Sequence, residues 1–186
     1  LEGLVKKIFS EHAIERSVGY AAINALSQHI LHQEKVKLEN VDVLDIVGKF
    51  PGEPIFMVGK IRPIYNALKK KGRKVLVKDF NKGIQDPGMG ESYDGGILII
   101  TGSSLSNETL GNELDTFKNV RLAIFIGPSA QVLPGWLFDL TNIDVVASMF
   151  FSSPLEAFTA IKQGGGTPNF VRHARKYTFF KNNIIT

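Results

Sequence analysis

Residues 96–107 read GILIITGSSLSN, a strand-like apolar run that leads directly into small and hydroxylated residues. The continuous apolar segment Ile97–Ile100 is typical of a strand that is covered on both faces of a parallel sheet. In such sheets, ligands bind outside the carboxyl ends of the strands, where the following loops lie. This stretch therefore predicts both a parallel α/β fold and a small-molecule site at the edge of its sheet.

The same alternation of strands and helices extends from about Pro54 to Gly166. Strands are expected at 55–58, 74–78, 96–100, 121–126 and 143–147, and helices at 63–71, 107–117, 135–140 and 154–162. This order predicts a Rossmann-like parallel sheet of about five strands with flanking helices and right-handed crossovers. Segment 81–95 is expected to form an irregular loop, and 167–186 a tail or an edge extension.

A small helical part is expected before the sheet. The helix that includes Arg16–Ser27 carries small residues around its whole circumference, which indicates close approach by neighbouring elements. The breaker Pro51-Gly52-Glu53-Pro54 follows a second short helix at 41–50. We therefore predict two parts, an N-terminal helical part at 1–53 and a Rossmann-like domain at 54–186.

Composition excludes several classes of protein. The 186 residues have a formal net charge of +4 and no cysteine, and the mean hydropathy is close to zero. No apolar run approaches the roughly 18 residues that a membrane span needs, and the basic cluster 69–74 has no interleaved aromatic residues for nucleic acid. Cytoplasmic location fits the lack of cysteine. We expect no membrane or nucleic-acid partner, and a homo-oligomer is left open.

The residues that follow the predicted strands are the candidate ligand-binding residues: Gly59, Lys60, Asp79, Thr101, Gly102, Ser103, Ser104, Gly127, Pro128 and Ser129. After the third strand, Ser106 is placed as the N-cap of a helix that begins at Asn107. A loop of this composition before a capped helix can hold an anion or a polar ligand. The alternative, that these hydroxyls satisfy only local turns, stays open.

Standard dinucleotide binding is not expected. Asp79 lies 20 residues after Gly59, a spacing at which an acidic residue can accept a ribose hydroxyl. However, the turn Val58–Pro63 has one glycine instead of the G-x-G-x-x-G pattern, and Pro63 removes an N–H group at the helix start. A nucleoside-like ligand held in another way stays open.

Two polar residues of the N-terminal part are further candidates. Asn24 lies in the middle of the small-residue helix and must find partners if it is buried. Arg16, at the start of the same helix, is placed where it could face an anionic ligand. His29 and His32 are interpreted as surface residues, since a metal site needs a third ligand. No metal site is predicted, and the sequence specifies neither a cofactor nor catalytic residues.

Several segments together resemble the DUF364 family, a heavy-metal chelation domain by its label, with part of its DUF4213 enolase-N-terminal-like companion. The segments are ERSVGYAAINA (15–25), MVG (57–59), IITGSSLSNETL (99–110), IGPSA (126–130) and QGGG (163–166). The resemblance implies a site between the two parts. By this analogy the site includes Arg16, Gly19 and Asn24 on one side, and Gly59, Thr101, Gly102, Ser103, Asn107, Gly127, Pro128 and Ser129 on the other.

The chain departs from the family in two ways. The β-strands that usually precede the first helix are expected to be missing, so that only the helical part of the cap is present. Lys78-Asp79 stands where relatives tend to carry a glutamate, which weakens a specific role for Asp79.

The main functional hypothesis is a small-molecule-binding protein or enzyme of the DUF364 type, with a polar ligand such as a metal chelate. The alternatives are a nucleotide or S-adenosylmethionine-type enzyme that uses Gly59 and Asp79, or a non-catalytic interaction subunit. The sequence leaves open whether a reaction is catalysed.

Overall fold

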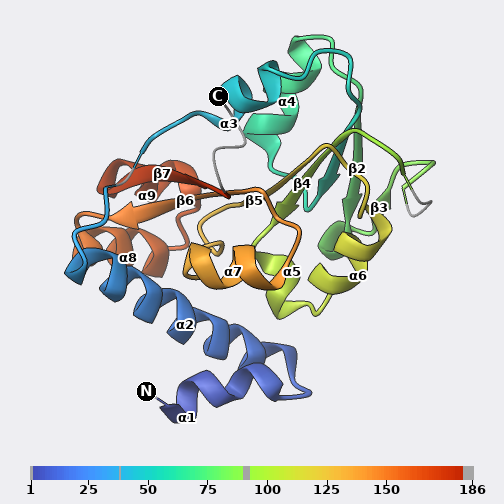
Figure 1. Ribbon diagram of the computed structural model, residues 1–186. Helices are drawn as coiled ribbons and strands as arrows, with labels where there is room; N and C mark the ends of the chain where they lie inside the picture. Colours follow the sequence, from blue (N-terminus) through green and yellow to red (C-terminus); the bar gives the residue numbers. More distant parts are fainter. Residues whose placement is uncertain (1, 38, 90–92, 182–186) are drawn as a thin grey trace.

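A seven-stranded sheet forms the centre of the molecule, in the order β3-β2-β1-β4-β5-β6-β7 (Figure 1). The computed structural model describes residues 2–37, 39–89 and 93–181. Strands β1, β2, β4, β5 and β6 are parallel, whereas the edge strands β3 and β7 are antiparallel. The bounds are β1 Ile55–Val58, β2 Val75–Asp79, β3 Ile84–Gln85, β4 Ile97–Thr101, β5 Leu122–Ile126, β6 Val145–Phe151 and β7 Ala174–Phe180.

Helices cover both faces of the sheet, which explains why the central strands are apolar throughout. Alternate residues such as Ile55 and Met57 pack on one core cluster, and Phe56 and Val58 on the other. Helices α3 (Val43–Gly48) and α4 (Arg62–Lys70) cover the first face, and α6 (Leu110–Thr116) and α7 (Pro134–Leu140) cover the second. Every residue of β1 is buried as a result.

The N-terminal part is a helical hairpin that lies across the carboxyl ends of the strands (Figure 1). It contains α1 (Glu2–Val5), the 3₁₀ helix η1 (Lys6–Phe9) and the 21-residue α2 (Ala13–Gln33). Helix α2 bonds to the loop after β5, where Asn24 Nδ2 donates to Ser129 O at 3.1 Å, and to β7, where Gln28 Nε2 donates to the Tyr177 hydroxyl at 3.2 Å. The helix thus covers the edge at which the site was predicted.

The remaining elements lie at the two ends of the sheet. Helices α8 (Pro154–Lys162) and α9 (Thr167–Phe170) and the 3₁₀ helix η3 (Val171–His173) connect β6 to β7, and η2 (Phe80–Lys82) connects β2 to β3. A small third core of Met149, Ala157 and Phe170 packs α8 and α9 against β6. No helix in the described ranges is long and apolar enough to cross a membrane.

The predicted mixed α/β fold with an N-terminal helical part is confirmed, with differences in detail. The tail contains β7, which pairs along the whole of β6, and segment 81–95 contributes β3, with 90–92 outside the described residues. The division at residue 53 stays a prediction, although α3 before it packs into the core of the sheet.

The prediction that a helix begins at residue 107 and continues to 117 is wrong about where the helix begins. The chain forms a short α5 (Ser103–Ser106) and then α6, because Glu108 between them has a left-handed φ of +56° that interrupts the helix. Ser106 therefore ends α5, and Thr109 is the N-cap residue of α6.

Candidate functional site

The site lies at the switch point of the sheet. From β1 the chain passes through α4 to β2 on one side, and the next long strand, β4, lies on the other side of β1. The loops after β1 and β4 therefore separate and leave a crevice at the carboxyl edge. This crevice is lined by Val58, Gly59, Asp79, Phe80, Asn81, Thr101, Ser103, Ser104, Asn107 and Thr109.

Gly59 allows the first two loops to approach each other. Its φ of +84° favours glycine, and a Cβ at this position would lie 2.7 Å from Thr101 Cγ2. The Thr101 side chain thus packs directly against the main chain of Gly59. The single glycine of this turn therefore allows contact between the loops after β1 and β4.

Gly102 makes a second close approach. A Cβ at Gly102 would lie 2.5 Å from Ala130 N and against the main chain of Ser129. The adjacent Gly127 has a φ of +122°, and its carbonyl accepts from Ser148 Oγ at 2.8 Å. The turn Gly127–Ser129, which includes Pro128, is therefore packed against the loop after β4.

Hydroxyl and amide groups cover the floor of the crevice. Thr101 Oγ1 and Ser103 Oγ share a hydrogen bond of 2.8 Å. The Asn107 side chain lines the crevice and has no hydrogen-bond partner within the described part of the chain. The free volume is about 10 Å³, which is the room of one water molecule. Anything larger must lie above this floor.

Asp79 connects the ends of β1 and β2. Its Oδ2 accepts from the Lys60 N–H at 3.0 Å and from Lys82 Nζ at 2.8 Å. Burial alone would raise the pKa of Asp79, but the hydrogen bonds from Lys82 and from the Lys60 amide lower the pKa below its ordinary value of 3.8. The Lys60 ammonium itself points elsewhere and lies 4.0 Å from the centre of the Tyr65 ring.

Replacement of Asp79 should lower the free energy of unfolding by an amount that depends on pH. Because the pKa is lower in the folded state, the ionised carboxylate stabilises the fold above about pH 4, and this contribution is lost as the pH falls through the folded-state pKa. We expect Asp79→Asn to lower the free energy of unfolding by about 1–2 kcal/mol at pH 7. Urea unfolding at pH 7 and at pH 3 should give a gap between the two proteins that narrows at the lower pH. The exposed Asp115→Asn is the control, and a gap independent of pH would contradict the assignment.

Arg16 connects α2 to the loop between α5 and α6. Its Nε donates to Ser106 O at 3.1 Å, and its Nη2 lies 3.2 Å from Glu108 Oε2. Nη1 donates to the carbonyls of Ser10 and Glu11 at 2.9 and 2.8 Å. Only 8% of the residue is exposed. Arg16 thus fixes the connection between η1 and α2 with Nη1, and it fixes α2 to the loop between α5 and α6 with Nε and Nη2.

The other two N-terminal candidates differ in position. Gly19 packs on η1, where a Cβ would lie 2.5 Å from the Ile8 amide nitrogen. Asn24 lies against the loop after β5 and bonds to Ser129 O. Its Oδ1 is buried without a partner in the described residues. The structure thus brings Asn24 to the edge of the sheet, and it places Gly19 within the N-terminal hairpin.

Sequence reasoning missed a buried ion pair next to the crevice. Lys78 Nζ on β2 lies 2.7 Å from Glu113 Oε1 on α6, with 17% and 3% of the two side chains exposed. The ammonium also lies 4.8 Å from the centre of the Phe80 ring, which lines the crevice. The two partners are 35 residues apart, so no local pattern indicates the pair.

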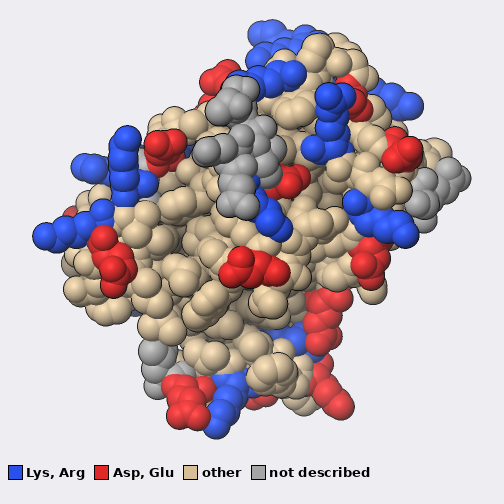
Figure 2. All heavy atoms as spheres, viewed as in Figure 1, with Lys and Arg blue, Asp and Glu red and all other residues tan. Residues whose placement is uncertain are grey.

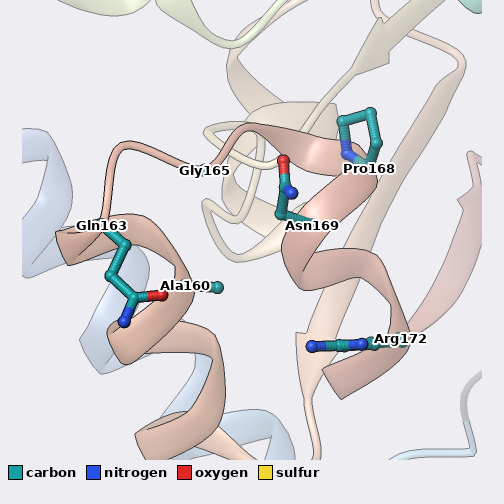
Figure 3. Close-up of a pocket in the computed structure, with 6 residues that line it drawn as sticks. All are labelled: Ala160, Gln163, Gly165, Pro168, Asn169 and Arg172. Carbon is teal, nitrogen blue, oxygen red and sulfur yellow. The ribbon is translucent and has the colours of Figure 1, made fainter.

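A larger hollow lies away from the predicted residues, between α8 and α9 (Figure 3). It has a volume of about 290 Å³ and is lined by Ala160, Gln163, Gly165, Pro168, Asn169 and Arg172. A Cβ at Gly165 would lie 2.7 Å from Ala160 O, so this glycine allows the two helices to approach. The hollow has polar side chains in Gln163, Asn169 and Arg172, but none of them is among the described polar groups that are buried without a partner.

The charges and potential metal ligands give no alternative site. Basic and acidic side chains are interspersed on the face shown in Figure 2. Among the residues that the structure describes, no group of three or more His, Asp or Glu side chains could hold a metal ion. The residues present therefore do not fit a soft metal bound directly by the chain, since such a metal prefers several thiolate or imidazole ligands.

The comparison with family models decides the classification. The model of DUF364, described as "Putative heavy-metal chelation", matches residues 42–180. The chain belongs to the DUF364 family. The match includes all seven strands and every crevice residue, and it starts after α2.

Relatives extend the likeness of this DUF364 chain to its N-terminal part. An uncharacterized protein of Methanocaldococcus jannaschii is 29% identical over 96% of this chain and 71% of its own length. The crystal structure of a DUF364 protein of unknown function from Pyrococcus horikoshii has a TM-score of 0.79 at 28% identity, covering 96% of this chain and 74% of that one. A second, from Desulfitobacterium hafniense, has a TM-score of 0.73 at 20% identity, covering 95% and 72%, and supports the fold alone.

Proposed function

We propose that this DUF364 protein binds one small polar molecule between α2 and the carboxyl edge of the sheet, over the loops after β1, β4 and β5. The observation that carries the proposal is the crevice at the switch point, whose floor contains the hydroxyls of Thr101, Ser103 and Ser104. Ligands of open α/β sheets bind at such a point. The residues proposed for the site are Arg16, Gly19, Asn24, Gly59, Lys60, Asp79, Thr101, Gly102, Ser103, Ser104, Asn107, Gly127, Pro128 and Ser129, of which Gly19 acts only by packing α2 on η1.

Within this proposal the residues have different tasks. Gly59 and Gly102 act by allowing the loops to meet, and Asp79 and Arg16 act by fixing neighbouring segments. Ser103 and Asn107 contact the ligand, because the Asn107 amide is unengaged and the Ser103 hydroxyl shares only one hydrogen bond. We further propose that the N-terminal part corresponds to the helical portion of an enolase-N-terminal-like cap and that the protein is cytoplasmic.

A metal enters this site as a chelate. The family description concerns heavy metals, yet the chain has no cysteine and no suitable cluster of described ligands. Hydroxyl and amide groups instead suit the oxygen-rich outer surface of an organic metal complex. An ordinary dinucleotide fits less well, because the turn after β1 has one glycine instead of the G-x-G-x-x-G pattern.

The double substitution Ser103→Ala/Asn107→Ala tests the proposal. We expect it to abolish binding but to lower Tm by no more than about 5 °C, because about one net hydrogen bond is lost. Thermal shift with Fe(III)–citrate, citrate alone, sugars, amino acids, adenosine and S-adenosylmethionine should identify a stabilising class for the wild-type protein. The matched control is Ser17→Ala/Asn112→Ala, at two exposed positions. An equal response of wild type and double variant, or no response to any probe, would refute this function.

A further inference from the structure

Three side-chain oxygens near the crevice are buried without a hydrogen-bond partner in the described chain. They are Ser104 Oγ, Thr109 Oγ1 and Glu113 Oε2. Only 3% of Ser104 and 3% of Glu113 is exposed, and Ser104 and Thr109 line the crevice. Thr109 and Glu113 are four residues apart at the start of α6, so they lie on the same side of this helix. Buried polar groups normally have partners, so this concentration at one place needs an explanation.

The missing partner must be a hydrogen-bond donor. Glu113 Oε1 accepts from Lys78 Nζ at 2.7 Å, and the other carboxylate oxygen, Oε2, can accept hydrogen bonds but has none to donate. The two hydroxyls can accept as well as donate. A carboxylate or phosphate of a ligand would bring further acceptors and a second negative charge toward Glu113. An N–H or O–H group of a ligand would instead donate hydrogen bonds to these unpartnered oxygens.

The size of the space restricts the donor further. The crevice floor has about 10 Å³ of free volume, so it admits a single group of the size of water. A terminal hydroxyl or ammonium group meets this limit, but a planar amide or a ring does not. A hard metal cation is also unfavourable, because such cations take six or more oxygen ligands and this set offers only three unpartnered oxygens.

We propose that the inner end of this crevice is a donor-specific subsite, in which Ser104, Thr109 and Glu113 accept hydrogen bonds from a terminal hydroxyl or ammonium group of the ligand. Lys78 is a positioning residue that holds the Glu113 carboxylate. This inference rests on the proposed function and adds to it a class of ligand: polyols, amino alcohols or amines, bound by their donor end. Ser103 and Asn107 then contact the outer part of the same molecule.

Small probes of matched size test the subsite in the whole chain. Methylammonium and methanol each carry a donor, whereas tetramethylammonium has charge without an N–H group and formate is a small carboxylate. We would titrate each at constant ionic strength and follow the ¹H–¹⁵N signals of Ser104, Thr109 and Glu113. Saturable shifts from methylammonium or methanol support the subsite, and the stronger of the two identifies ammonium or hydroxyl as the donor. The subsite is contradicted if formate or tetramethylammonium causes saturable shifts as large as those from the donors. It is also contradicted if neither methylammonium nor methanol causes a saturable shift.

Thr109→Val separates binding from folding. The substitution removes an unpartnered hydroxyl and keeps the shape, so it should leave Tm unchanged or raise it. The affinity for the effective donor should fall about five-fold, which corresponds to the loss of one hydrogen bond. Thr116→Val is the control on the same helix, since its hydroxyl bonds to Asn112 O away from the crevice. Unchanged affinity in Thr109→Val contradicts the subsite.

The two proposals fail in different ways. The donor probes could fail to bind while Ser103→Ala/Asn107→Ala still abolishes binding of a larger compound. This result would contradict the donor subsite but support the proposed function. If the donor probes bind but the double variant retains every larger ligand, the location of the outer site falls.

Discussion

Gly102→Ala should lower the free energy of unfolding by about 3 kcal/mol, although it adds a single methyl group. The new Cβ would lie 2.5 Å from Ala130 N and against the main chain of Ser129. Because these neighbours are backbone atoms between β5 and α7, they cannot move aside as a flexible side chain could. Urea unfolding measures the loss.

Gly111→Ala is the matched control for this change. Gly111 lies inside α6 with no atom within 4 Å of the added Cβ. Alanine is the better helix former, so this variant should gain about 0.5–1 kcal/mol. If both variants lost the same stability, the contact at Gly102 would not be the cause.

Lys78→Met should cost about 3–5 kcal/mol, because it leaves the Glu113 carboxylate buried without its counter-ion. The pair has a distance of 2.7 Å, and 3% of the carboxylate side chain is exposed. Removal of both charges has a different result. We expect Lys78→Met/Glu113→Leu to recover most of the loss, since an apolar pair of similar volume replaces a buried ion pair at little cost.

Lys6→Met provides the comparison on the surface. The Lys6–Glu2 pair has the same 2.7 Å distance, but 70% and 82% of its side chains are exposed. Exposed pairs contribute little, so denaturant unfolding should barely change. A double variant at Lys78 and Glu113 that remained as unstable as Lys78→Met would show that packing, and not charge, is responsible.

The parallel core was predictable because its signal is local. Each central strand is a short apolar run, and β4 ends in the small residues that mark the sheet edge. The edge strands were less predictable for a physical reason: β3 was not expected, and β7 was expected only as a tail or an edge extension. β7 reads ARKYTFF, which has basic residues at one end, and it becomes a strand only because β6 offers seven residues for pairing.

The candidate site was predictable in location but not in detail. Residues at the carboxyl ends of strands, such as Thr101 and Asp79, could be predicted to lie near each other because the topology brings these ends to one edge of the sheet. The Lys78–Glu113 pair and the unpartnered Thr109 hydroxyl depend on the interruption at Glu108, which directs α6 toward β2. Nothing in the sequence around Glu108 favours a left-handed residue there over a continuous helix.

Helix α2 is held to the sheet domain by hydrogen bonds near both of its ends. Arg16 fixes one end to Ser106, and Gln28 fixes the other to Tyr177, about 18 Å further along the axis at 1.5 Å per residue. The helix cannot move away from the sheet about one end, because the contacts of Arg16 and Gln28, and that of Asn24 between them, would have to break together. We therefore expect a ligand to enter and leave without displacement of the helix.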